Sequence, residues 1–183
     1  KYKTPNMVGY NRRFYSTFEK GVEHIRKKGK LYGILIEGHE RFWKIKKTRN
    51  KILLNNWIYA NSTHTIDLLR YFGGEFEKIF SLKKSVYNKS GDQFSMILES
   101  KNKTIATYVS NWYSPGGWTV RLFGDRITVL FDPLEKGYVI DHNFTKKIIK
   151  PSKKDIEFKP GFYKQLMYFK KLIVDKKLHW PAQ

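Results

Sequence analysis

Hydrophobic positions recur with period two over most of the chain after Leu31. Short β-branched and aromatic runs are separated by Gly-, Asn- and Asp-rich segments, a pattern typical of strands joined by tight turns. In residues 94–100 every second side chain is large and apolar, so one sheet face should be packed and the other more open. The eight runs are LYGILIEGH (31–39), FEKIFSLKKSVY (76–87), FSMILES (94–100), TIATYVSNW (104–112), WTVRLFG (118–124), RITVLF (126–131), YVIDHNF (138–144) and KIIK (147–150).

Short connections between most of these runs favour an antiparallel meander, because parallel neighbours need long crossovers. One further strand and three helices accompany it. Residues 6–14 resemble a short strand that ends in a doubly basic tip. Residues 17–28 have their apolar side chains on one helical face, Ser16 and Glu19 have capping-box spacing, and Gly29 can end the helix.

Two further helices are available to cover the packed face of the sheet. One begins near Asn61 and ends at Gly73 and Gly74. The other lies at the C-terminal end, where Phe162, Leu166, Phe169 and Ile173 form one stripe. The pattern therefore predicts an α+β fold: an open, predominantly antiparallel β-sheet with helices packed on one face.

Composition narrows the class of protein. With 183 residues, of which 40% are hydrophobic and 16% aromatic, the chain can bury one sizeable core. It has no cysteine, so disulfides and thiolate metal sites are excluded. No apolar run is long enough to span a bilayer, and we expect a cytoplasmic protein without a membrane partner.

The formal net charge of +20 permits a different function, binding to nucleic acid or another polyanion. Lysine far outnumbers arginine, however, and the lysines occur as short pairs spread along the chain rather than as one dense block. Dispersed lysine is typical of a solvated surface, whereas base and phosphate recognition favours arginine. A basic nucleic-acid- or polyanion-binding module therefore remains the alternative hypothesis.

His64 and Asp67 stand one helical turn apart in NSTHTIDLLRYFGG, residues 61–74. If Asn61 is the N-cap, His64 lies in the first turn, where the helix dipole favours a neutral imidazole. A carboxylate one turn later favours the cation, and these opposed influences suit a proton-transferring group near neutral pH. A capping or packing role for His64 is the competing interpretation.

The order of several segments resembles the Gfo/Idh/MocA family of NAD(P)-dependent sugar oxidoreductases. The segments are VGYNRRF (8–14), GKLYGILIEG (29–38), NNWIYANSTHTIDLLRYFGGEFEKI (55–79) and WTVRLFGDRITVLFD (118–132). The resemblance begins just after the nucleotide-binding half of that family. It implies that residues 1–30 are a residual strand and helix from the end of that half, and that residues 31–183 form the substrate-binding and oligomerisation domain.

The resemblance also implies roles for individual residues. His64 would be the acid/base group and Asp67 the carboxylate that orients it. Arg12, with Asn11, would contact the sugar. Asn61 or Thr63 would supply any local hydrogen bond, because Ala60 stands where many relatives carry aspartate. Aromatic residues would line the pocket mouth, with sheet packing as the alternative role; the candidates are Trp112, Tyr113 and Trp118.

The cofactor is expected to bind elsewhere. No two glycines are separated by a single residue, so the Gly-x-Gly-x-x-Gly phosphate cradle is absent from this chain, and the family's Glu-Lys-Pro tripeptide is absent too. We therefore expect NAD or NADP in the intact enzyme but no cofactor-binding residue here, and no activity of this piece alone.

The expected partners follow from the same resemblance. They are a sugar or nucleotide-linked sugar, the missing N-terminal Rossmann domain, and further copies of the chain bound through the open sheet face. A non-catalytic relative that keeps only the fold is a third possibility. The five histidines lack metal-site spacing, so no metal is expected, and no Gly-x-Ser-x-Gly motif occurs.

Overall fold

The computed structural model describes residues 5–48, 50–177 and 180–181. Its helical elements are η1 (Asn11–Phe14), α1 (Ser16–Lys28), α2 (Phe42–Ile45), η2 (Lys46–Thr48), α3 (Lys51–Asn55), η3 (Ile58–Ser62), α4 (Thr63–Gly73), α5 (Lys153–Glu157) and α6 (Phe162–Asp175). Its strands are β1 (Leu31–Gly38), β2 (Phe76–Lys84), β3 (Gln93–Ser100), β4 (Ile105–Asn111), β5 (Trp118–Gly124), β6 (Ile127–Phe131), β7 (Gly137–Asp141) and β8 (Lys146–Ile149).

All eight predicted strands form and join one sheet in the order β2-β3-β4-β1-β5-β6-β7-β8. The predicted simple meander is wrong in one respect, because β1 lies between β4 and β5 and runs parallel to β4. The long helical connection from β1 to β2 makes this possible, since such a crossover can bring the chain back in the same direction. The other neighbouring pairs are antiparallel.

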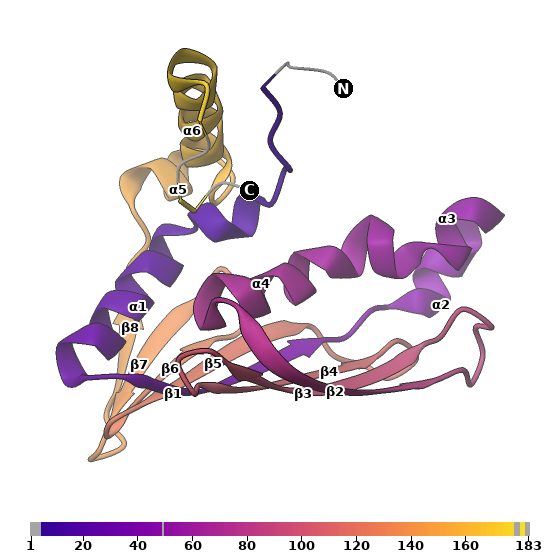
Figure 1. The fold of residues 1–183 in the computed structure, drawn as a ribbon, viewed down its shortest axis with the longest axis horizontal. Helices are drawn as coiled ribbons and strands as arrows, with labels where there is room; N and C mark the ends of the chain where they lie inside the picture. Colours follow the sequence, from indigo (N-terminus) through magenta and orange to yellow (C-terminus); the bar gives the residue numbers. More distant parts are fainter. Residues whose placement is uncertain (1–4, 49, 178–179, 182–183) are drawn as a thin grey trace.

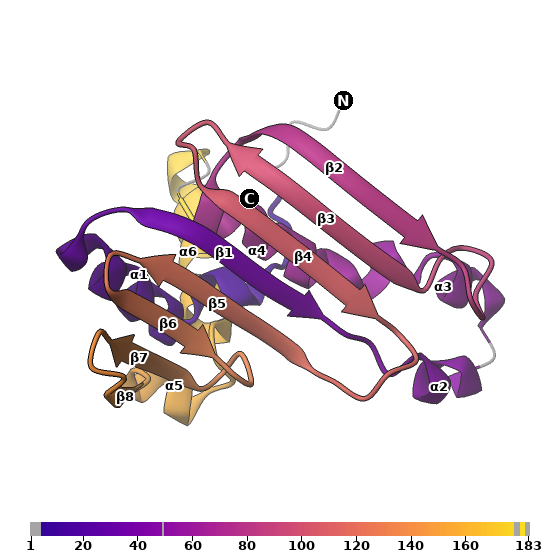
Figure 2. The same cartoon turned by 90° about the horizontal axis from the view of Figure 1, so that it is seen from below.

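One face of the sheet is covered by α1 and α4 (Figures 1 and 2). Alternate residues of the central strands, such as Ile36 and Leu122, are fully buried beneath these helices, together with Phe18 and Leu68. The predicted α+β architecture with an open, mostly antiparallel sheet is confirmed. None of the helices in the described part of the chain is long and apolar enough to cross a lipid bilayer.

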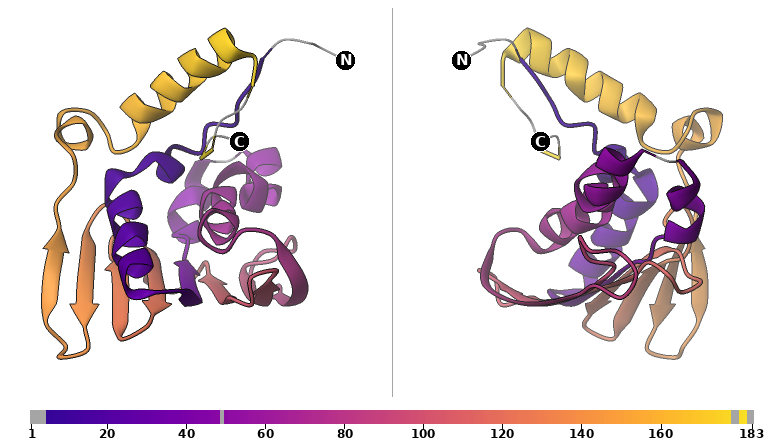
Figure 3. Two further views of the ribbon diagram at one scale, coloured as in Figure 1. Left: turned by 60° about the vertical axis from the view of Figure 1, so that its left-hand side comes forward. Right: turned by 90° about the vertical axis from the view of Figure 1, so that its right-hand side faces the viewer.

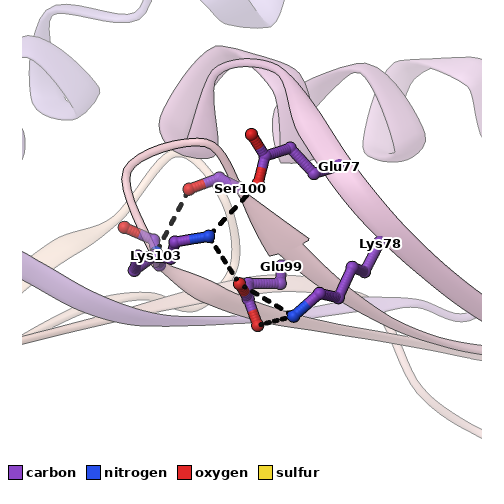
Figure 4. Close-up of polar contacts among 6 residues, drawn as sticks. Glu77, Lys78, Glu99, Ser100 and Lys103 are labelled. Carbon is purple, nitrogen blue, oxygen red and sulfur yellow. Dashed lines mark hydrogen bonds and ion pairs between the residues drawn. The ribbon is translucent and has the colours of Figure 1, made fainter.

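The opposite face of the sheet remains open and carries apolar side chains. Phe80, Ile97 and Ile105 are each more than half exposed on neighbouring strands. At one end of these strands Lys78 binds Glu99 across the β2–β3 pair, and Lys103 bridges Glu77 and Glu99 (Figure 4). Such exposed pairs contribute little stability.

Residues 6–14 do not form the expected strand. Residues 5–10 are irregular, and η1 follows them. A strand needs a neighbouring strand to satisfy its backbone groups, and the described chain pairs none with this segment. The helix predicted at 17–28 is confirmed, and Gly29 ends it with φ of +132°. Ser16 is not its N-cap, however, because the Ser16 hydroxyl donates to Asp155 instead.

The C-terminal helix α6 does not cover the sheet, contrary to the prediction. It projects from the body beside the N-terminal segment (Figures 1 and 3). Its predicted stripe is therefore partly uncovered, with Phe162, Leu166 and Ile173 each at least half exposed. Asp155 fixes the base of this arm, because its carboxylate accepts hydrogen bonds from the Ser16 amide and hydroxyl and from the Gly161 amide.

Candidate functional site

The short helix η1 carries two adjacent arginines, Arg12 and Arg13, and lies beside α4. Asn11 lies beside them and donates its Nδ2 to the Pro160 carbonyl at 3.3 Å, while its Oδ1 accepts from Arg12 at 3.0 Å. Gly161 follows with φ of +78°, and an added Cβ there would overlap the carbonyl oxygen of Asn11. The base of the α6 arm therefore packs directly against the residues that hold Arg12.

Arg13 and Asp67 form a buried, two-pronged ion pair. The Arg13 Nε lies 2.6 Å from one Asp67 oxygen and its Nη2 lies 2.7 Å from the other. Their side chains are 1% and 7% exposed. The carboxylate therefore joins η1 to α4, and the described structure contains no hydrogen bond between Asp67 and His64. The expected orienting contact between these two residues is not formed.

His64 lies on α4 against two aromatic rings. Its ring centroid is 5.6 Å from that of Tyr10, edge-on, and 6.3 Å from that of Trp118. Burial, followed by the positive charge of Arg12, lowers the pKa of His64 to about 4. The expected pKa near neutrality is wrong, because burial and the charge of Arg12 both lower it and because Asp67, bound to Arg13, forms no contact that would raise it.

Arg12 meets His64 at the same indole. Its guanidinium carbon lies 4.7 Å from the centre of the Trp118 ring, a cation–π contact. Unlike Arg13, it has no carboxylate ion pair among the described residues, and burial lowers its pKa. The Nε atom of Arg12 and the Nδ1 atom of His64 are both buried without a hydrogen-bond partner in the described chain. A buried polar atom without a partner needs an explanation, and contact with a bound ligand or water is one.

Glu40, which the sequence analysis did not select, lies beneath the start of α4. Its side chain accepts two contacts from the Asn61 Nδ2 at 3.0 and 3.1 Å and one from the Ser62 hydroxyl at 3.0 Å. Asn61 thus reaches a carboxylate of its own chain. The predicted helix N-cap at Asn61 is also wrong, because this residue lies within η3, a π-helical turn continuous with α4.

Two of the three aromatic candidates lie away from His64. Trp112 is 2% exposed and packs against Phe42 and Phe94, with its indole N–H donating to Ser110. Tyr113 packs against Tyr87, with the two rings tilted and their centroids 4.3 Å apart. The structure brings only Trp118 of this group to His64 and Arg12, so Trp112 has the packing role that was its alternative.

The described residues do not provide a phosphate-binding helix start for a dinucleotide. Asp155 already accepts the Ser16 amide at the start of α1 and the Gly161 amide before α6, and η3 leads into α4 without a break. Free amides at a helix start are the usual phosphate ligands. The Gly-x-Gly-x-x-Gly loop that cradles a dinucleotide is absent from the sequence as well, so the described residues do not fit a nicotinamide cofactor. No group of three or more potential metal ligands occurs in the parts of the chain that the structure describes.

A family model described as the GFO/IDH/MocA C-terminal domain matches residues 38–130, just over half of the chain. No curated protein matches the chain in sequence. Among solved structures, levoglucosan dehydrogenase in complex with NADH and levoglucosan has 14% identity and a TM-score of 0.76, over 98% of this chain and 59% of that chain.

Two further solved structures have a similar fold. An oxidoreductase from Agrobacterium radiobacter, in complex with NAD+, L-tartaric acid and magnesium, has 13% identity and a TM-score of 0.70, over 97% of this chain and 57% of that chain. UDP-N-acetylglucosamine 3-dehydrogenase from Acidithiobacillus ferrooxidans has 14% identity and a TM-score of 0.69, over 93% and 53%. The chain spans little more than half the length of these structures, and identities this low establish the fold alone.

Proposed function

Because this chain belongs to the GFO/IDH/MocA C-terminal domain family, we propose that it is the substrate-binding and oligomerisation half of an NAD(P)-dependent sugar oxidoreductase. The family expected from the sequence motifs is confirmed. One observation carries the proposal beyond the fold: His64 and Arg12, from distant parts of the sequence, contact the same Trp118 ring. A proton-accepting group and a hydrogen-bond donor are thereby placed side by side.

The proposed chemistry at His64 is proton transfer with a sugar hydroxyl. With a pKa of about 4 the imidazole is neutral at pH 7, so it can accept a hydrogen bond and then the proton as the hydroxyl becomes a ketone. Arg12 has no carboxylate partner in the described chain and can donate to substrate oxygens. The hydride step belongs to the nucleotide-binding half, since the residues present here do not fit a dinucleotide.

The proposed substrate is a sugar, either free or nucleotide-linked. Solved relatives of similar fold act on levoglucosan and on UDP-N-acetylglucosamine, as their names state. The aromatic surface of Trp118 beside a guanidinium suits the apolar face and the hydroxyl edge of a pyranose. We assign His64, Arg12 and Trp118 to this site, with Asn11 orienting Arg12 through its side-chain oxygen.

The oligomerisation part of the proposal concerns the open sheet face. Phe80, Ile97 and Ile105 form an exposed apolar surface next to a charged border (Figure 4). Exposed apolar patches on a sheet usually mark an interface. We propose that a second copy of the chain covers this face.

The proposed function is tested by joining the chain to a nucleotide-binding half and following NAD(P)H absorbance with a panel of free and nucleotide-linked sugars. We expect sugar-dependent reduction of NAD+ or NADP+. His64→Ala should lower kcat by about 100-fold or more, the usual effect of losing a general base. The control His142→Ala changes an exposed histidine after β7 and should leave kcat unchanged. Full activity of His64→Ala would remove His64 from the proposed mechanism.

A further inference from the structure

Glu40 is a buried carboxylate that the proposed proton transfer does not use. It follows β1, is 5% exposed, and forms no ion pair with any residue that the structure describes. Burial raises its pKa, and hydrogen bonds and the charge of Arg12 oppose that rise. Burying a carboxylate costs free energy unless hydrogen-bond donors surround it. The segment that supplies those donors is therefore the segment that the carboxylate can hold in place.

These donors come from one turn of helix. Asn61 and Ser62 are the last two residues of η3, and both direct their side chains to Glu40. The π-helical turn holds one more residue than an α-helical turn, and such turns are frequent at functional sites. Thr63 and His64 follow immediately, so the geometry of η3 decides the direction in which the His64 side chain leaves the helix.

We infer that Glu40 is a positioning residue of the site: its carboxylate holds η3 in the π-helical form and so keeps His64 against Trp118, beside Arg12. This inference rests on the proposed function only for its relevance to catalysis. Glu40 also lies close enough to Arg12 to compensate its charge without forming an ion pair. A purely structural role would stabilise the fold without any effect on the surroundings of His64.

The test is an NMR titration of the His64 imidazole in this chain, with its signal assigned by its loss in a His64→Asn variant. Glu40→Ala removes the acceptor, and we expect the pKa of His64 to rise from about 4 by at least one unit toward 6.5, as the ring moves into solvent. Loss of the negative charge alone would act in the opposite direction, because it leaves Arg12 less compensated. An unchanged or lowered pKa in a folded Glu40→Ala variant would overturn the inference.

Two control variants distinguish the hydrogen bonds of Glu40 from its charge, and its specific role from a nonspecific effect of losing a carboxylate. Glu40→Gln keeps an acceptor for Ser62 and should leave the His64 signal close to that of the wild type. Glu37→Ala removes a carboxylate at the end of β1 that accepts a hydroxyl hydrogen bond from Thr119 of β5 on the open face of the sheet, and it should have no effect. If Glu40→Ala does not fold, Ser62→Ala removes one donor and should give a smaller rise in the pKa of His64.

The two hypotheses fail in different ways. If the chain joined to a nucleotide-binding half shows no sugar-dependent activity while the pKa of His64 still rises in Glu40→Ala, the positioning role stands and the proposed function fails. If activity is present and Glu40→Ala changes neither the pKa of His64 nor kcat, the positioning role fails and the proposed function stands.

Discussion

The partner that a side chain finds in three dimensions decides its role, and Asp67 illustrates this. Its spacing from His64 suggested an orienting contact, but both carboxylate oxygens bind Arg13. Spacing along a helix identifies which residues share a face, and says nothing about a competing donor from a distant segment. Glu40 was missed for the same reason, since it lies far from His64 in sequence. Its only local signal is a carboxylate two residues after the end of β1.

Breaking the Arg13–Asp67 pair should be strongly destabilising. Asp67→Asn leaves the Arg13 guanidinium buried without its counter-charge, and the expected loss is about 3–5 kcal/mol of unfolding free energy. The measurement is urea denaturation. Glu75→Gln is the matched control, because it breaks an exposed Arg–carboxylate pair near the end of the same helix, and should cost less than about 1 kcal/mol. Equal losses in both variants would contradict this view of the pair.

The low pKa of His64 predicts how stability depends on pH. Its folded value of about 4 lies below the reference value of 6.5, so between these values the unfolded chain binds a proton that the folded chain does not. Stability from this group is complete above pH 6.5 and declines as the pH falls toward 4. Because the ring is only half buried, we expect a contribution of about 1–2 kcal/mol.

The measurement for this prediction compares the wild-type chain with His64→Gln by denaturation at several pH values. The variant should lose less stability between pH 6.5 and 4, and the two curves should run parallel above pH 7. If the difference between the two proteins were constant across this range, His64 would not titrate as the structure indicates.

At the scale of elements, the hydrophobic pattern correctly predicted those helices and strands that depend mainly on local sequence. The eight strands and the helix α1 have clear apolar periods and formed where the sequence placed them. Four features depended on distant contacts and were not predicted correctly: the irregular segment at 5–10, the place of β1 beside β4, the π-helical turn η3 and the position of α6. The apolar stripe of α6 correctly identified a helix, but an amphipathic pattern does not specify which surface covers it.

Gly161 precedes α6 and packs against η1, and a side chain should be poorly tolerated at this position. Its φ of +78° favours glycine, and a Cβ would meet the Asn11 backbone that supports Arg12. Gly161→Ala should therefore reduce the unfolding free energy by at least about 1–3 kcal/mol and displace the α6 arm. Gly117→Ala is the control, since open space surrounds that position. Thermal unfolding measures both, and equal melting temperatures would show that the junction is less tight than described.

At the scale of the whole molecule, the open sheet face makes the proposal of self-association testable. Ile97 is 56% exposed and lies beside Phe80 on the neighbouring strand. Ile97→Lys should convert the expected dimer to a monomer in sedimentation experiments with little change in melting temperature. Ile52→Lys alters an isoleucine that is 79% exposed on α3 and should leave the dimer intact. A wild-type chain that stays monomeric at high concentration would contradict the proposal.

The central place of β1 also affects the order in which this sheet can assemble. The strands β2 to β4 and the strands β5 to β8 are each made of neighbours in sequence, which can pair early through short loops. β1 is synthesised before all of them, yet both of its neighbours lie far downstream, with Gly33 opposite Ile105 and Ile34 opposite Leu122. The two half-sheets are joined only through β1, so we expect the core to consolidate late in folding, once this early strand has paired on both sides.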